Sequence, residues 1–262
     1  MFRTPFPRSG LTEMPRKIYK LFISYDEAGA ELRRHVAEQF QYSSDCIWQA
    51  SFRGLTAEDL PPGDGVVWVY PVFMQSGVTV TETLPELLRV LYAGNGQHPE
   101  LVFKPVWGAG RGGIGFGVAA ALRKELEGEA SLLVVAHGVT GREAAPEPAQ
   151  FLRQLRFLLP EGTDMALAYF GASPSVEKVL PELKGQKVIV LPFLIGKGKH
   201  MREDMPAPEL AARHGKTLKI LPPFGAFYLQ AEREYWKAGM EEPAGNGFDR
   251  PAGSNTEDAG AW

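Results

Sequence analysis

Apolar residues along the chain gather in short runs, which alternate with longer segments whose apolar positions recur every three to four residues. Short apolar runs are typical of parallel strands buried on both faces, and the periodic segments are typical of helices that cover them. The predicted strands are residues 19–24, 46–50, 65–70, 101–105, 131–136, 165–169, 187–191 and 218–221. The predicted helices are residues 31–39, 84–92, 117–126, 149–158, 176–183 and 228–238. This alternation predicts an α/β protein.

The pattern of the first half of the chain returns in the second half about 120 residues later. The sequence Pro-Val-Trp-Gly-Ala at 105–109 returns as Pro-Pro-Phe-Gly-Ala at 222–226, each time between a predicted strand and a predicted helix. Further matching pairs are Leu-Pro at 60–61 and 180–181, and Pro-Val-Phe-Met at 71–74 with Pro-Phe-Leu-Ile at 192–195. A recurring pattern of this length indicates a duplicated structural unit.

The repeat divides the chain into two similar half-domains of about four strands each, residues 17–127 and 128–240. Residues 1–16 form an N-terminal extension. Residues 241–262 are rich in Gly, Asn, Asp, Pro and Glu and show no apolar period. Such a segment buries too little surface to offset the entropy lost on ordering, so we expect a mobile tail.

The composition narrows the classes of function. A net charge of -3 offers no general attraction to nucleic acid or to an anionic membrane. The single cysteine, Cys46, excludes an intramolecular disulfide and a metal cage of thiolates. No apolar run approaches the roughly 20 residues that span a bilayer, and the first 20 residues lack the apolar stretch of a signal peptide. We therefore expect a cytoplasmic protein whose partners include neither nucleic acid nor membrane.

Two of the five histidines, His137 and His200, follow predicted strands of the second half. In α/β sheets, active sites usually lie just beyond the carboxyl ends of the strands. A single histidine in such a loop is as often a hydrogen-bond partner for the loop backbone as a functional group. Two histidines in matching positions favour one shared site.

The sequences around both histidines resemble those of the class II tetrapyrrole chelatases, a family that includes sirohydrochlorin cobaltochelatases and ferrochelatases. The resemblance lies in Val-Val-Ala-His-Gly at 134–138 and in Pro-Phe-Leu-Ile-Gly-Lys-Gly-Lys-His-Met-Arg-Glu-Asp-Met-Pro at 192–206. Residues 168–175 and 222–225 fit the same pattern, so the resemblance covers about residues 131–236. Two positions depart from it: Val139 replaces a frequent small polar residue, and Lys199 replaces a frequent glycine.

The resemblance implies two similar half-domains, each a four-stranded, mainly parallel sheet flanked by helices, which face a central cleft. It also implies that His137 and His200 are the catalytic residues and hold the metal, a divalent Co, Fe or Ni ion that is itself a substrate. Insertion removes two pyrrole protons, and an imidazole with a pKa near 6.5 both binds such an ion and accepts a proton. No cofactor would be permanently bound.

The repeat matches Thr79 to His200 and a position near Asp26 to His137, so we expect a single active site. Glu82 is a candidate metal ligand from the first half. The alternative for Glu82 is a solvated carboxylate at a helix start, where the helix dipole favours a negative charge.

The remaining site residues come from the second half. Lys197, Lys199 and Arg202 place three cations around His200, either to bind the carboxylates of a tetrapyrrole or as part of a solvated loop. Gly138 is also expected to contact the substrate. Asp204 is expected to cap the following helix and to help hold His200.

Two other functions compete with metal insertion. The first is a non-catalytic tetrapyrrole-binding or metal-binding protein of the same fold. The second is a dinucleotide-dependent oxidoreductase, because residues 110–115 satisfy the Gly-x-Gly-x-x-Gly spacing. That motif requires an acidic residue at the end of the next strand, where this chain has His137. The duplicated chain contains both halves, so a monomer and a homodimer are both compatible with it.

Overall fold

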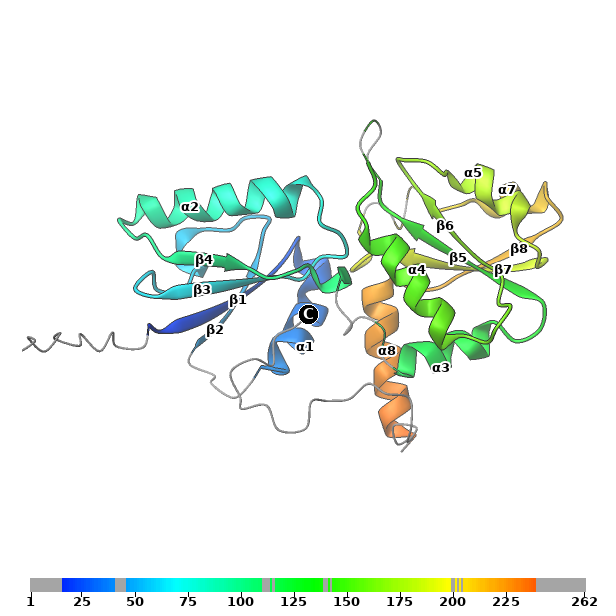
Figure 1. The fold of residues 1–262 in the computed structure, drawn as a ribbon, viewed down its shortest axis with the longest axis horizontal. Coiled ribbons are helices and arrows are strands. Elements are labelled where there is room, and N and C mark those ends of the chain that lie inside the picture. The colour runs from blue at the N-terminus through cyan, green and yellow to red at the C-terminus, as the bar shows by residue number, and fades with distance from the viewer. Residues whose placement is uncertain are drawn as a thin grey trace, which may run out of the picture.

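The computed structural model describes residues 16–40, 46–109, 114, 116–138, 141, 143–198, 201, 203 and 205–238. These residues form two four-stranded parallel sheets, which lie next to each other along the longest axis of the molecule (Figure 1). The strand order is β2-β1-β3-β4 in the first sheet and β6-β5-β7-β8 in the second. Both halves thus share one topology, which confirms the predicted α/β fold of two similar units.

The first sheet contains β1 (Ile18–Ser24), β2 (Ile47–Ser51), β3 (Val66–Pro71) and β4 (Glu100–Phe103). The second contains β5 (Ala130–Ala136), β6 (Met165–Tyr169), β7 (Lys187–Phe193) and β8 (Thr217–Ile220). The longer helices are α1 (Ala30–Glu38), α2 (Leu84–Gly94), α3 (Phe116–Glu125), α4 (Glu147–Leu158) and α8 (Phe224–Lys237). The short ones are α5 (Val176–Val179), α7 (Pro208–Ala212), η1 (Glu27–Gly29), η3 (Ala57–Asp59), η4 (Thr79–Thr83), η5 (Trp107–Ala109) and η7 (Leu180–Glu182). None of the helices described is long and apolar enough to cross a membrane.

Both faces of each sheet are buried, because successive side chains of a strand point to opposite faces and helices cover both. In β1, Leu21 and Ile23 pack with Leu84 and Leu88 of α2, whereas Phe22 points to the opposite face. In the second sheet one face packs against α5, η7 and α7, and the other contributes to a larger cluster shared by the two halves.

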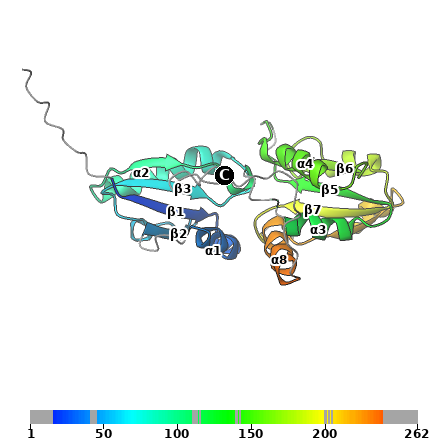
Figure 2. The ribbon, with the colours of Figure 1, turned by 60° about the horizontal axis from the view of Figure 1, so that its bottom comes forward.

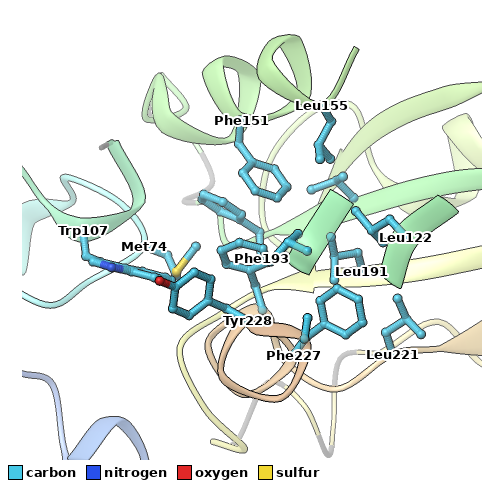
Figure 3. Packing of buried hydrophobic residues seen from close by; sticks show 14 of the residues in the cluster. Met74, Trp107, Leu122, Phe151, Leu155, Leu191, Phe193, Leu221, Phe227 and Tyr228 are labelled. Carbon is cyan, nitrogen blue, oxygen red and sulfur yellow. The ribbon is translucent and has the colours of Figure 1, made fainter. Parts of the chain in front are cut away.

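This larger cluster joins the two half-domains. Met74 and Trp107 from the first half pack with Phe193 and Tyr228 from the second, as Figure 3 shows. The Trp107 ring lies 5.2 Å from the Tyr228 ring in an edge-on arrangement and 5.7 Å from the ring of Phe224. We call the surface along which the halves meet the seam.

Helix α3 follows the first sheet in the chain but packs beneath the second sheet, alongside α8 (Figures 1 and 2). Its Val118 and Leu122 belong to the cluster that contains the inner face of β5 and β7. A Cβ atom on Gly117 would lie 2.6 Å from the carbonyl oxygen of Ala231, so glycine permits the close approach of α8. Helix α8 in turn contacts α1 of the first half, where Tyr228 meets His35 edge-on.

The strand pairing gives a residue-by-residue match between the halves. Ile23 pairs with Pro71 in the first sheet as Val135 pairs with Pro192 in the second. The hydrogen bonds beyond the strands repeat as well: the Phe52 amide donates to the Ser24 carbonyl at 2.8 Å, and the Phe170 amide to the Ala136 carbonyl at 3.1 Å. Tyr25 therefore occupies the position of His137.

The repeated Trp-Gly-Ala and Phe-Gly-Ala sequences have a steric cause. The Gly108 amide donates to the Phe73 carbonyl, and the Gly225 amide donates to the Leu194 carbonyl at the equivalent place. A Cβ atom would stand 2.0 Å from a carbonyl oxygen at Gly108 and 2.3 Å from one at Gly225. Only glycine lets the backbone come so close.

Gly225→Ala is accordingly expected to lower the free energy of unfolding by about 2 kcal/mol, because the backbone must move to relieve the contact with the Ile195 carbonyl. Urea unfolding followed by circular dichroism measures the change. Gly77→Ala is the control, because a Cβ atom there meets nothing within 4 Å and the residue has no positive φ. Equal losses in the two variants would show that the close approach at Gly225 has no special weight.

Candidate active site at the seam

The carboxyl ends of the two sheets meet at the seam. After β1 the chain enters η1, where Gly29 lies against the Ile195 side chain and Ala28 against Gly196, both in the loop that follows β7. In the reverse direction, η5 of the first half contacts α4, which follows β5. Loops that leave the strand ends of each half are therefore in contact with the other half.

His137 stands directly after β5 and is half-buried. Ala136, the last residue of β5, pairs with Phe193, the last residue of β7. Neighbouring strands lie about 4.8 Å apart, so the loop that carries His137 and the loop that leads to residue 200 leave the sheet next to each other. Within the residues described, no group of three or more His, Cys, Asp or Glu side chains is placed to hold a metal ion.

Four of the predicted site residues, Lys199, His200, Arg202 and Asp204, lie outside the described residues. Lys197 is described and is exposed at the end of the loop after β7. The approach of His137 to His200, the cationic surroundings of His200 and the capping role of Asp204 therefore stay predictions.

The glycine after His137 is fixed by packing. A Cβ atom on Gly138 would lie 2.5 Å from the Cβ of Ala172 and 3.1 Å from the Cβ of Tyr169. The loops after β5 and β6 are thus in direct contact, which holds the backbone beside His137. Burial raises the pKa of Tyr169, so its phenol stays neutral near pH 7.

The first half lacks an imidazole at the matching position. Its residue there is Tyr25, one position before the Asp26 expected from the sequence. Thr79, matched to His200, is the first residue of η4. The strand ends of this half are joined instead by the buried Arg33, whose guanidinium donates to the Ser24 hydroxyl at 2.7 Å and to the Ser51 hydroxyl at 2.9 Å.

The acidic partner of this guanidinium is Glu27, which lies 3.7 Å from it. A hydrogen bond from the Ser51 hydroxyl, and then the charge of Arg33, lower the pKa of Glu27. Partners from its own half therefore hold this guanidinium through Nη1, whereas its buried Nε has no hydrogen-bond partner among the described residues.

Glu82, the predicted ligand from the first half, is exposed on η4. It lines an open cavity of about 500 Å³ together with Ser76, Arg89 and Lys104. Its exposed side chain fits the solvated carboxylate at a helix start. Glu82 also borders the cavity, and Ser76 in the cavity wall contacts the second half. Both interpretations of Glu82 therefore stay open. Its role as a metal ligand stays a prediction.

The glycine-rich segment 110–115 lies outside the described residues except for Ile114. Its neighbours nevertheless bear on dinucleotide binding. The strand before it, β4, and the strand after it, β5, belong to different sheets. A dinucleotide-binding motif joins two strands of one sheet through its helix. The connection from β4 through α3 to β5 does not have that form.

A buried carboxylate at the seam was missed by the sequence reasoning. Glu147, the first residue of α4, is 4% exposed, and its Oε1 accepts a hydrogen bond of 2.5 Å from the Ser76 hydroxyl of the first half. Its Oε2 has no hydrogen-bond partner among the described residues. The helix start favours a negative charge there. The sequence signal available was weak, because an acidic residue is common in the first turn of any helix.

Ser76→Ala is expected to lower the free energy of unfolding by about 1–3 kcal/mol, because it removes the observed hydrogen bond to a buried carboxylate. The same substitution in a Glu147→Gln background tests the coupling, since a neutral amide is less costly to leave unpaired. The four proteins are compared by urea unfolding at pH 7. Additive effects in this cycle would mean that the two side chains are not coupled across the seam.

Comparison with known proteins finds sequence similarity in the second half of the chain and similar folds among solved structures. Residues 131–232 match the CbiX family model. One similar structure is CbiX, the terminal enzyme for biosynthesis of sirohaem in denitrifying bacteria. It superposes on this chain with a TM-score of 0.51 at 20% sequence identity, and the match covers 86% of this chain and 100% of the CbiX chain. No curated protein sequence matches the chain.

Two structures of SirB are similar as well. SirB from Bacillus subtilis with Fe3+ has a TM-score of 0.56 at 12% identity, over 85% of this chain and 98% of its own. The sirohydrochlorin chelatase SirB from Bacillus subtilis subspecies spizizenii, in complex with cobalt, has a TM-score of 0.53 at 14% identity, over 87% and 97%. At these identities the solved structures establish the fold, and the sequence match covers the half that carries His137. Residues 131–232 are therefore similar in sequence to the CbiX family, and the chain as a whole has the fold of the CbiX and SirB structures.

Proposed function

We propose that this protein is a cytoplasmic chelatase that inserts a divalent metal, Co or Fe, into sirohydrochlorin or a related tetrapyrrole during cobalamin or sirohaem biosynthesis. The observation that carries the proposal is the position of His137: it follows β5 directly, at the seam, within the half matched by the CbiX model. The metal is a substrate. The similar SirB structures with Fe3+ and with cobalt support both metals as candidates.

Metal insertion makes two demands on the site. The ion must be held after losing part of its water shell, and two pyrrole protons must leave as four nitrogens take the metal. Neutral imidazoles at positions 137 and 200 meet both demands, since each offers a nitrogen to the ion and can accept a proton. A site of two imidazoles leaves coordination positions open, which suits transfer of the ion to the macrocycle.

A single catalytic site follows from the degenerate first half. Tyr25 stands where the second half has His137, and Thr79 stands at the predicted counterpart of His200. A phenol or a hydroxyl is a poorer ligand for divalent Co or Fe than a neutral imidazole. Lys197, exposed at the loop end, is proposed to pair with carboxylates of the macrocycle together with Lys199 and Arg202.

The proposal is tested by anaerobic incubation of the purified protein with sirohydrochlorin and either Co²⁺ or Fe²⁺, followed by absorbance spectroscopy. A rate of metal insertion above the spontaneous rate is expected for at least one metal. Binding of the macrocycle without any faster insertion would instead support the non-catalytic tetrapyrrole-binding protein.

A further inference from the structure

We propose that the first half binds the face of the tetrapyrrole ring through three aromatic side chains, Tyr25, Phe52 and Phe73, with Arg53 pairing to a carboxylate at the ring's edge. We call Tyr25, Phe52 and Phe73 the aromatic platform. The inference rests on the proposed function for the identity of its ligand. It adds a role for the half that lacks the catalytic histidines.

The platform is a compact group of rings. The Tyr25 and Phe52 rings are stacked, with centroids 5.8 Å apart and planes inclined by 28°. Phe73 meets Tyr25 edge-on at 6.4 Å. Phe52 and Phe73 rest on the core beneath α2, whereas Tyr25 is 44% exposed. Tyr25 is therefore the most exposed ring of the group, and the two others support it.

The position of the platform relates it to the catalytic half. Strand pairing matches Tyr25 to His137, and the repeated hydrogen bonds match Phe52 to Phe170 and Phe73 to Leu194. The rings thus follow the carboxyl ends of β1, β2 and β3, where the second half has its candidate site. Two residues beyond Tyr25 the chain enters η1, which contacts the loop after β7.

Arg53 supplies the charge. Its guanidinium lies over the Tyr25 ring at 5.6 Å, and its amide donates to the Tyr25 carbonyl at 2.9 Å. Arg53 is exposed, in contrast to the buried Arg33, which is held by Ser24 and Ser51. A guanidinium beside a stack of rings is thus placed to meet an anionic group at the edge of a flat molecule.

These features fit a planar, polyanionic ligand. Aromatic rings attract other flat π-systems in offset-stacked geometry, and a tetrapyrrole offers a large face of this kind with carboxylates around its rim. If the first half takes one face of the macrocycle, the opposite face is left for the metal that His137 and His200 deliver. In a symmetric pair, each half would have to bind the ring and deliver the metal. Here the first half would bind the ring and the second half would deliver the metal.

The test measures binding without metal. Uroporphyrin, a stable porphyrin polycarboxylate, is titrated into the full chain and followed by fluorescence. Tyr25→Ala and Phe52→Ala are each expected to raise the Kd about tenfold, within the range known for stacking on aromatic side chains. Tyr25→Phe keeps the ring and is expected to retain the wild-type Kd. Arg53→Ala is expected to weaken binding and to reduce its dependence on salt.

Phe157→Ala is the matched control, because Phe157 is 89% exposed on the last turns of α4, away from the strand ends. Its Kd is expected to be unchanged. A wild-type Kd in Tyr25→Ala, with the wild-type protein active in metal insertion, would overturn the platform and leave the proposed function intact. Binding that depends on Tyr25 in a protein that inserts no metal would support the platform and overturn the chelatase. Absence of uroporphyrin binding to the wild type would overturn the platform.

Discussion

Replacing either His137 or His200 with alanine is expected to reduce metal insertion at least about a hundredfold, the lower end of what a positioned proton acceptor contributes. Each substitution removes a ligand to the ion and a proton acceptor at once. Binding of the macrocycle is expected to change much less, because the contacts proposed for its face and its carboxylates come from other side chains. Initial rates of insertion and Kd for the metal-free macrocycle, measured on the same proteins, separate the two effects.

Thr79→Ala is the control in the first half, since Thr79 occupies the predicted counterpart of His200 on η4. It should change neither insertion nor binding. A His137→Ala, His200→Ala double variant that still inserts metal above the spontaneous rate would show that the imidazoles are not the catalysts. Glu82, beside the open cavity, and Glu147, buried at the seam, would then be the acidic candidates.

Trp107→Ala is expected to cause the largest loss of stability, about 3–5 kcal/mol. The Trp107 ring is 3% exposed and contacts Phe224 and Tyr228 of the other half, so its removal leaves a cavity at the centre of the seam (Figure 3). In a protein of this size the midpoint of thermal unfolding should fall by roughly 10 °C. Scanning calorimetry is the suitable measurement because it also counts transitions.

Loss of the seam contact is further expected to split one thermal transition into two as the halves become less coupled. Phe157→Ala serves again as the control, since an exposed ring far from the seam contributes within about 0.5 kcal/mol. A loss below 1 kcal/mol in Trp107→Ala would mean that the halves are held together mainly by other contacts, such as those between α3 and α8.

The sequence pattern predicted all eight strands, most clearly the central strands β1, β3, β5 and β7, which are apolar runs buried over most of their length. It missed η4, where three threonines and a valine suggest no helix, since β-branched residues lose side-chain freedom in one. Burial of Val80 supplies the stabilisation that local propensity lacks there. A helix was expected after Asp204, but the pattern gave no bounds for the short α7, because five residues carry too little periodicity.

The strands that carry the candidate site were predictable from the sequence, but the contacts between the two halves were not. The position of His137 after β5 follows from the sequence, whereas the match of Tyr25 to it does not. Sequence spacing alone placed the counterpart near Asp26, and only the strand pairing fixes it at Tyr25. The Ser76 contact of Glu147 joins residues 71 positions apart, and nothing in a local pattern indicates such a pairing.

The path of α3 has a consequence for how this architecture could have arisen. In sequence α3 belongs to the first repeat, but its apolar face packs against the sheet of the second repeat. The second compact half therefore includes a helix from the first repeat. In two separate copies the contact of α3 with this sheet would run between molecules, although α8, the counterpart of α3, contacts β7 of its own half. Joining the copies in one chain makes the contact of α3 intramolecular and independent of protein concentration. The two halves can therefore stay together while only one of them carries the histidine.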